Sequence, residues 1–146
     1  MEDKLQKFIA LTKVPKVGPV IAKNLISYCG SIDAVFTEKK QHLLKIPGIG
    51  QVFAENFDPS STLSEAEAEL EFIRKNDIQV LTYLDKVYPA RLNNFESSPI
   101  VLYAKGNADL NHFRTVAVVG TRKPSAYGVT MCERIIEGLK PYNVLL

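Results

Sequence analysis

The stretch Thr115–Gly128, with the sequence TVAVVGTRKPSAYG, decides how the second half of this chain folds. A continuous apolar run ends at Gly120, then a hydroxyl, two adjacent cations and a proline follow, and a helix begins. This order predicts a buried parallel strand that delivers a loop to the N-terminus of a helix. Backbone amides, the helix dipole and the Arg122 guanidinium would then face one anionic group. We therefore interpret the loop as a phosphate-binding site.

Further apolar runs predict the elements around this stretch. Three strands are expected over residues 78–84, 100–106 and 116–119, and a fourth strand is expected to begin at residues 144–146. A helix is expected from about Ala126 to Leu139, with an apolar face that is buried. That face consists of Val129, Cys132, Ile135, Ile136 and Leu139. A strand, a helix and a second strand joined by short links form a right-handed parallel crossover, so a Rossmann-like parallel sheet is expected.

Composition limits the class of protein. The 146 residues are 46% hydrophobic and 23% charged, enough for a folded core, and the net charge of +2 does not by itself argue for nucleic acid. The two cysteines, Cys29 and Cys132, lie in apolar helical surroundings, which favours a reducing cytoplasm, and no Cys or His spacing resembles a metal site. No apolar run approaches the ~18 residues that span a membrane. A cytoplasmic protein without a metal is expected.

An internal repeat organises the first third of the chain. At an offset of 32 residues, 11–25 align with 43–57, and each copy reads as a helix, a Pro-x-[Val/Ile]-Gly turn and a second helix. Each copy resembles the helix-hairpin-helix motif, and two copies resemble the double helix-hairpin-helix domain of DNA-handling proteins. In that family the turn presents free amides to a DNA phosphate. The candidate contacts are therefore Lys16, Gly18, Gly48 and Gly50.

The two turns differ in chemistry. The first has Lys16 where a glycine is expected and lies among lysines, whereas the second has both glycines but Glu55 and Asp58 nearby. DNA contact and a structural or protein-docking role both remain open for this segment. The turn-rich sequence Asp58–Thr62 predicts the domain boundary. We expect a helical domain over residues 1–62 and a partial Rossmann-like domain over residues 63–146, an α plus α/β organisation.

Three motifs in the second domain carry a more specific resemblance. Tyr88-Pro89-x-x-Leu92, the run Pro99–Gly106 and the run Val116–Gly128 follow one another at the spacing seen in the DprA/Smf family. The resemblance implies a protein that binds single-stranded DNA and passes it to the recombinase RecA in bacterial natural transformation, without catalysis. It also implies a homodimer in the full-length form.

The same resemblance assigns residues to the strand-binding pocket. It includes Gly120, Thr121, Arg122 and Ser125, while Tyr127 and Gly128 shape the loop and the start of the helix. Lys123 is included as the second cation of the loop. Ser125 also reads as a helix cap, and Tyr127 either stacks on a base or packs against the loop.

Two other functions remain open. Nucleoside-phosphate-processing enzymes of the lysine-decarboxylase-like group also carry a strand, a glycine and an arginine loop, but their downstream Pro-Gly-Gly-x-Gly-Thr motif is not in this sequence. A protein-docking module is the second alternative. No Gly-x-Gly-x-x-Gly or Walker motif occurs, so no NAD or ATP cofactor is expected. The family's Rossmann domain continues well beyond the position of Leu146, so we expect an N-terminal portion of a longer protein.

Overall fold

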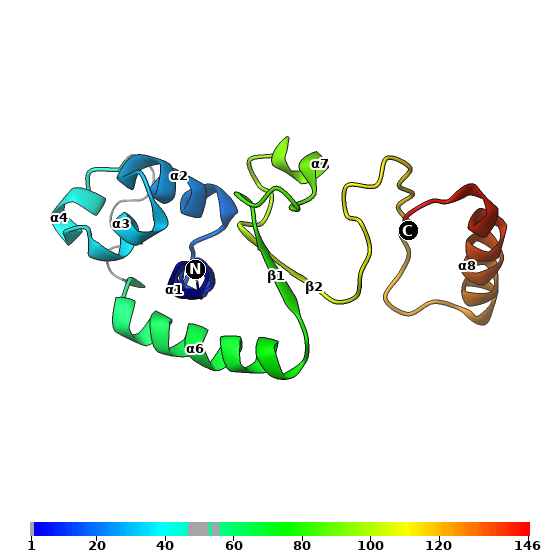
Figure 1. Ribbon diagram of the computed structural model, residues 1–146, viewed down its shortest axis with the longest axis horizontal. Helices are drawn as coiled ribbons and strands as arrows, with labels where there is room; N and C mark the ends of the chain where they lie inside the picture. The colour runs from blue at the N-terminus through cyan, green and yellow to red at the C-terminus, as the bar shows by residue number, and fades with distance from the viewer. Residues whose placement is uncertain (1, 47–52, 54–55) are drawn as a thin grey trace. The chain divides into compact units, whose positions relative to one another are not determined.

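The computed structural model describes residues 2–46, 53 and 56–146 (Figure 1). Contacts along the chain divide it into two compact units, the first through Gly106 and the second from Asn107 to Leu146. The first unit contains helices and a small sheet. Its described helices are α1 (Glu2–Lys13), α2 (Pro19–Cys29), α3 (Ile32–Thr37), α4 (Lys40–Leu43), α6 (Pro59–Lys75) and α7 (Ala90–Asn93).

Local chemistry sets the ends of the first helices. Pro19 occupies the first turn of α2, where its missing amide hydrogen costs nothing. Gly30 ends α2 in the left-handed region, with φ 86°, and its amide donates to the Ile26 carbonyl at 2.9 Å. Ser31 then caps α3, since its hydroxyl accepts the amide of Ala34 at 3.1 Å. The first helix pair of the expected tandem is therefore confirmed as a helix, a tight turn and a helix.

Helix α6 begins within the stretch Asp58–Thr62, which was expected to form a turn-rich domain boundary. The Asp58 carboxylate caps it by accepting the amides of Ser60 and Ser61 at 3.0 and 3.4 Å. The helix then packs along α1, and its buried side chains, Thr62, Ala66, Leu70 and Ile73, contribute to the core of the first unit. The expected boundary between residues 62 and 63 therefore falls inside α6.

The first unit also holds a two-stranded sheet. Strand β1 (Gln79–Thr82) pairs antiparallel with β2 (Val101–Ala104), in a register that joins Gln79 to Ala104 and Thr82 to Val101. The parallel sheet expected from the sequence is wrong for these two strands. A connection of 18 residues containing only the one-turn helix α7 brings the chain back beside β1 in the opposite direction.

The second unit contains α8 (Ala126–Leu139), the short 3₁₀ helix η1 (Lys140–Tyr142) and one parallel bridge. The bridge joins Thr115 to Leu145, with the Val116 amide donating to the Leu145 carbonyl at 2.9 Å. The expected buried strand over residues 116–119 does not form, and Val119 is 91% exposed. A strand needs a hydrogen-bonding partner along its length, and this segment is paired only at its beginning.

The apolar face of α8 is formed but is not buried as expected. Val129 and Ile135 are exposed, and Cys132, Ile136 and Leu139 are half-buried. The described residues thus show one antiparallel pair and one parallel bridge, and only the bridge has the relative direction of strands joined by a crossover. The expected Rossmann-like sheet is not confirmed among them.

Candidate nucleic-acid interface

The loop from Gly120 to Gly128 is organised by short hydrogen bonds to two hydroxyl groups. Ser125 caps α8, as predicted, because its Oγ accepts the Gly128 amide at 3.2 Å. The Thr121 hydroxyl accepts the Lys123 amide at 3.4 Å. A side chain at Gly128 would meet the Ser125 hydroxyl at 3.5 Å, an ordinary contact, and at Gly120 it would meet open space. These bonds hold the loop at the start of the helix.

The larger side chains of this loop extend into solvent. Arg122 and Lys123 are exposed, and Tyr127 is 74% exposed. Among the residues that the structure describes, no ion pair involves either cation. Two uncompensated positive charges beside the amino end of a helix produce a positive potential, which suits an anionic ligand. At this exposure the Tyr127 ring is not part of a packed core.

The first helix-hairpin-helix turn has the backbone shape that its sequence suggested. Lys16, which stands where the motif has a glycine, adopts the left-handed region with φ 64°. Gly18 is the N-cap of α2 and has no side chain to accept hydrogen bonds from the backbone amides of the first turn of that helix. The second turn, with Gly48 and Gly50, lies outside the described residues.

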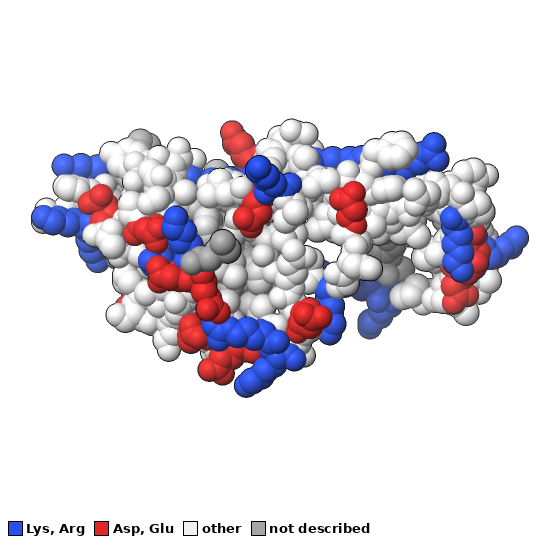
Figure 2. All heavy atoms as spheres, in the orientation of Figure 1, with Lys and Arg blue, Asp and Glu red and all other residues white. Residues whose placement is uncertain are grey.

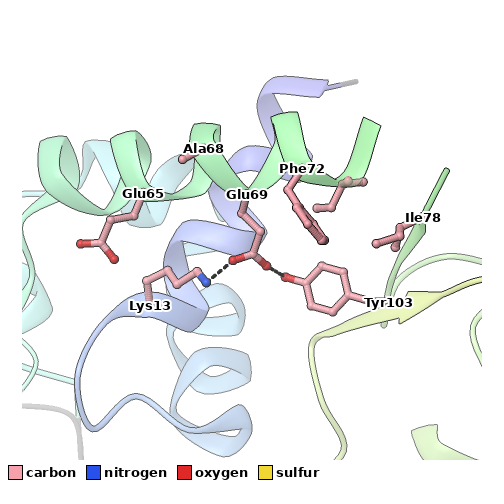
Figure 3. A pocket seen from close by; sticks show the side chains of 8 residues that line it. Lys13, Glu65, Ala68, Glu69, Phe72, Ile78 and Tyr103 are labelled. Atoms are coloured by element: carbon pink, nitrogen blue, oxygen red, sulfur yellow. Dashed lines mark hydrogen bonds and ion pairs between the residues drawn. The ribbon is translucent and has the colours of Figure 1, made fainter. Parts of the chain in front are cut away.

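Two of the three lysines around the first turn are held by the protein itself. Lys13 pairs with the Glu69 carboxylate, which also accepts a hydrogen bond from the Tyr103 hydroxyl (Figure 3). Burial acts to raise the pKa of Glu69, but the hydrogen bonds from Lys13 and Tyr103 outweigh it and lower the pKa. Burial and the bond to Glu69 raise the pKa of Tyr103. Glu69 of α6 thus contacts both Lys13 of α1 and Tyr103 of β2.

Lys23 is more completely engaged. Its ammonium donates to the carbonyls of Phe95 and Glu96 at 3.2 and 3.1 Å and to the Ser98 hydroxyl at 2.6 Å. The same group lies 5.6 Å from the centre of the Tyr83 ring. This lysine fixes α2 to the segment that leads into β2. Of the three lysines around the first turn, Lys16 is the one that is exposed to solvent and forms no ion pair with another described residue.

The remaining charges of the first unit are largely mixed in sign. Figure 2 shows acidic and basic side chains interleaved over the part of the molecule that holds α6. Arg74 pairs with Glu2 and Glu67, and Lys75 pairs with Glu71. Such a surface gives no sustained positive potential for a phosphate backbone. The loop after Gly120 is the better candidate for an anion.

The sequence analysis did not identify the aromatic and cationic cluster of His112, Phe113 and Arg114, which lies just before the apolar run that leads to the loop. The His112 ring lies 5.5 Å from that of Phe113. Arg114 lies over the same ring. The available signal was the order histidine, aromatic, arginine directly before the apolar run at Thr115.

No group of three or more His, Cys, Asp or Glu side chains in the described part of the chain is placed to hold a metal ion. None of its helices has the length and apolar character needed to cross a bilayer.

Two known families match separate parts of the chain. A family described as DNA recombination-mediator protein A matches residues 79–146. A family described as the SAM-like helix-hairpin-helix tandem matches residues 8–56. The second match includes the first copy of the repeat, residues 11–25, and all but the last residue of the second copy, residues 43–57.

Three curated relatives were also found. The DNA processing protein DprA of Streptococcus pneumoniae is 44% identical over 63 residues, or 43% of this chain and 22% of the relative. Protein Smf of Synechocystis is 29% identical over 143 residues, or 90% of this chain and 34% of the relative. DprA of Bacillus subtilis is 39% identical over 56 residues, or 38% of this chain and 19% of the relative. The chain thus spans about a fifth to a third of the length of these relatives.

Proposed function

The chain belongs to the DprA/Smf family of DNA-processing proteins, and from that premise we propose that it binds single-stranded DNA through the loop from Gly120 to Gly128. The observation that carries the proposal is the exposed pair Arg122 and Lys123 beside the Ser125-capped start of α8. Arg122 donates to a phosphate, since a guanidinium forms charge-assisted hydrogen bonds with anions. Thr121 and the loop amides surround the same phosphate.

The finer parts of the proposal concern what happens to the bound strand. In the whole protein, the strand passes to RecA during transformation, and the protein acts in the cytoplasm as a homodimer, by binding and without a catalytic step. The names of the DprA relatives support handling of DNA, and the name of the matched family supports a role in recombination. The loop supports an unmodified phosphate backbone as the ligand, because it offers charge and amides rather than paired acid and base groups.

A docking role is the second candidate, and it concerns the helical tandem alone. The observation that favours it is the engagement of Lys13 with Glu69 and of Lys23 with three acceptors of the segment 95–98. Lysines held in this way contribute little to a phosphate contact. We propose that the first hairpin supports the fold or a protein contact and that Lys16 adds little affinity for DNA.

The test of the proposed function is Arg122→Ala in the whole protein. Loss of one charge-assisted phosphate contact weakens binding of a single-stranded oligonucleotide by about 1–3 kcal/mol. The slope of log affinity against log salt falls by about 0.7, because one fewer counterion is released. Fluorescence anisotropy across a salt series measures both quantities.

Arg134→Ala is the matched control. Arg134 is also an exposed arginine of the second unit, but it lies on α8 beyond the loop. Its removal leaves the salt slope near that of the unsubstituted protein. If both variants lose equal affinity, the charge acts as a general field and the assignment of Arg122 is wrong.

A further inference from the structure

Hydrogen bonds hold the first and the last residue of the cluster His112, Phe113 and Arg114 in place. The His112 Nε2 donates to the carbonyl of Asn143 at 2.7 Å, since a carbonyl can only accept. The Arg114 Nη1 donates to the carbonyl of Tyr142 at 3.1 Å. Both anchors belong to the turn that follows α8, and the two anchored side chains flank Phe113 in the sequence.

Between these anchors the Phe113 ring faces solvent. It is 72% exposed. The guanidinium carbon of Arg114 lies 5.1 Å from the ring centre, and the His112 ring centre lies 5.5 Å away with its plane tilted by 44°. An aromatic ring with a cation beside it is a surface on which a flat aromatic ligand stacks, while the cation attracts an attached anion.

We propose that Phe113 and Arg114 form a stacking platform for one nucleobase of the bound single strand, a second contact beyond the loop. The inference rests on the proposed function, because it assigns a base contact to a strand whose phosphate is held at Arg122. Phe113 receives the face of the base. Arg114 uses one N–H in its bond to Tyr142 and has others in the same planar group for a neighbouring phosphate.

Position in the chain favours the same ligand for both contacts. Residues 115–120 lead from the platform to the loop, and even fully extended they span no more than about 22 Å. A strand of several nucleotides covers such a distance. The charge of the second unit agrees with a phosphate backbone, since five cations stand against three acids. These are Arg114, Arg122, Lys123, Arg134 and Lys140 against Asp109, Glu133 and Glu137.

The experiment compares Phe113→Ala with the unsubstituted protein on two strands of equal length. One is oligo(dT), and the other is a fully abasic strand with the same number of phosphates. Affinity for oligo(dT) falls about five- to tenfold, in the range of one lost stacked base. Affinity for the abasic strand and the salt slope stay unchanged, because no phosphate contact has been removed.

Two further variants protect the test from a folding defect. Phe113→Leu keeps an apolar side chain but removes the aromatic face, so it reproduces the loss on oligo(dT). Phe113→Trp retains or strengthens binding. Phe95→Ala is the control, because Phe95 is 61% exposed and belongs to the first unit.

The outcomes separate the platform from the function on which it rests. If Phe113→Leu binds oligo(dT) as the unsubstituted protein does, the platform is wrong and the Arg122 contact is unaffected. If either variant loses equal affinity for both strands, the effect is not stacking and the platform is again wrong. If the unsubstituted protein binds neither strand, both the platform and the proposed function are overturned.

Discussion

The two units of the molecule differ in what they bury. Every buried side chain among the described residues belongs to the first unit, and the fully described segment from Asn107 to Leu146 has none. Both units nevertheless form well-capped helices, with Ser31 capping α3 and Ser125 capping α8. Capping residues close in the sequence are therefore sufficient to form a helix in either unit. Burial of the apolar face of a helix requires another element that packs against it. In the first unit α6 provides that surface for α1.

The largest expected effect tests this difference directly. Leu25→Ala empties a fully buried position of α2 and lowers the free energy of unfolding by about 2–5 kcal/mol. Leu139→Ala removes a half-buried side chain of α8 and lowers it by less than about 1 kcal/mol. Urea unfolding followed by circular dichroism measures both.

Equal losses from the two leucine substitutions would contradict the comparison. They would mean that α8 packs against a surface as extensive as the one around α2. A loss of stability in Leu139→Ala but not in Leu25→Ala would place the core in the second unit rather than in the first.

A smaller effect is expected where the first unit uses a charge in place of apolar packing. Lys23→Ala removes the three hydrogen bonds that join α2 to the segment before β2 and leaves the buried Ser98 hydroxyl without its donor. The expected loss is about 1–2 kcal/mol, reduced from that of a fully buried charge because the lysine is half-exposed.

Lys16→Ala is the matched substitution. Lys16 is exposed and keeps its left-handed backbone with alanine in its place, so unfolding changes by no more than about 0.5 kcal/mol. Thermal unfolding of the two variants side by side distinguishes a structural lysine from a solvent-facing one. If the Lys23→Ala protein is as stable as the unsubstituted protein but binds DNA more weakly, Lys23 contacts nucleic acid and its structural role is wrong.

Much of the fold could be predicted from the sequence wherever the cause is local. The helix-turn-helix of the first repeat and the cap at Ser125 depend on residues a few positions apart, and both are as predicted. The strand over residues 116–119 is different. Its composition predicts a strand, but strand formation depends on neighbouring strands that a local pattern does not specify.

The candidate site shows the same limit. The sequence located the cations of the loop, and their exposure in the structure is compatible with that assignment. It could not show that the Lys23 ammonium donates hydrogen bonds to Phe95, Glu96 and Ser98, because those residues lie more than 70 positions away in the sequence. It also could not show that His112 and Arg114 are both held by the turn after α8. Long-range hydrogen bonds decide which charged residues remain available to a ligand.

The smallest expected effect concerns the ion pair at the junction of α1, α6 and β2. Glu69→Gln keeps a side-chain oxygen for the Tyr103 hydroxyl but removes the charge that pairs with Lys13. Near neutral pH the variant is expected to be less stable by about 0.5–1 kcal/mol, since the pair is only partly shielded from water. Glu137→Gln is the control, because that carboxylate pairs with Lys140 on the exposed side of α8 and its removal leaves stability unchanged.

The effect of pH on the Glu69→Gln variant has a definite sign. The pKa of Glu69 is lower in the folded protein than in the unfolded chain, so its contribution is complete above about pH 4.5 and is lost as the pH falls through the folded value. The stability difference between Glu69→Gln and the unsubstituted protein is therefore constant at neutral pH and shrinks below about pH 4.5. Urea midpoints between pH 3 and pH 7 measure it. A difference that persists unchanged at pH 3 would show that the substitution acts through packing, and that charge pairing adds nothing to the first unit beyond its apolar core.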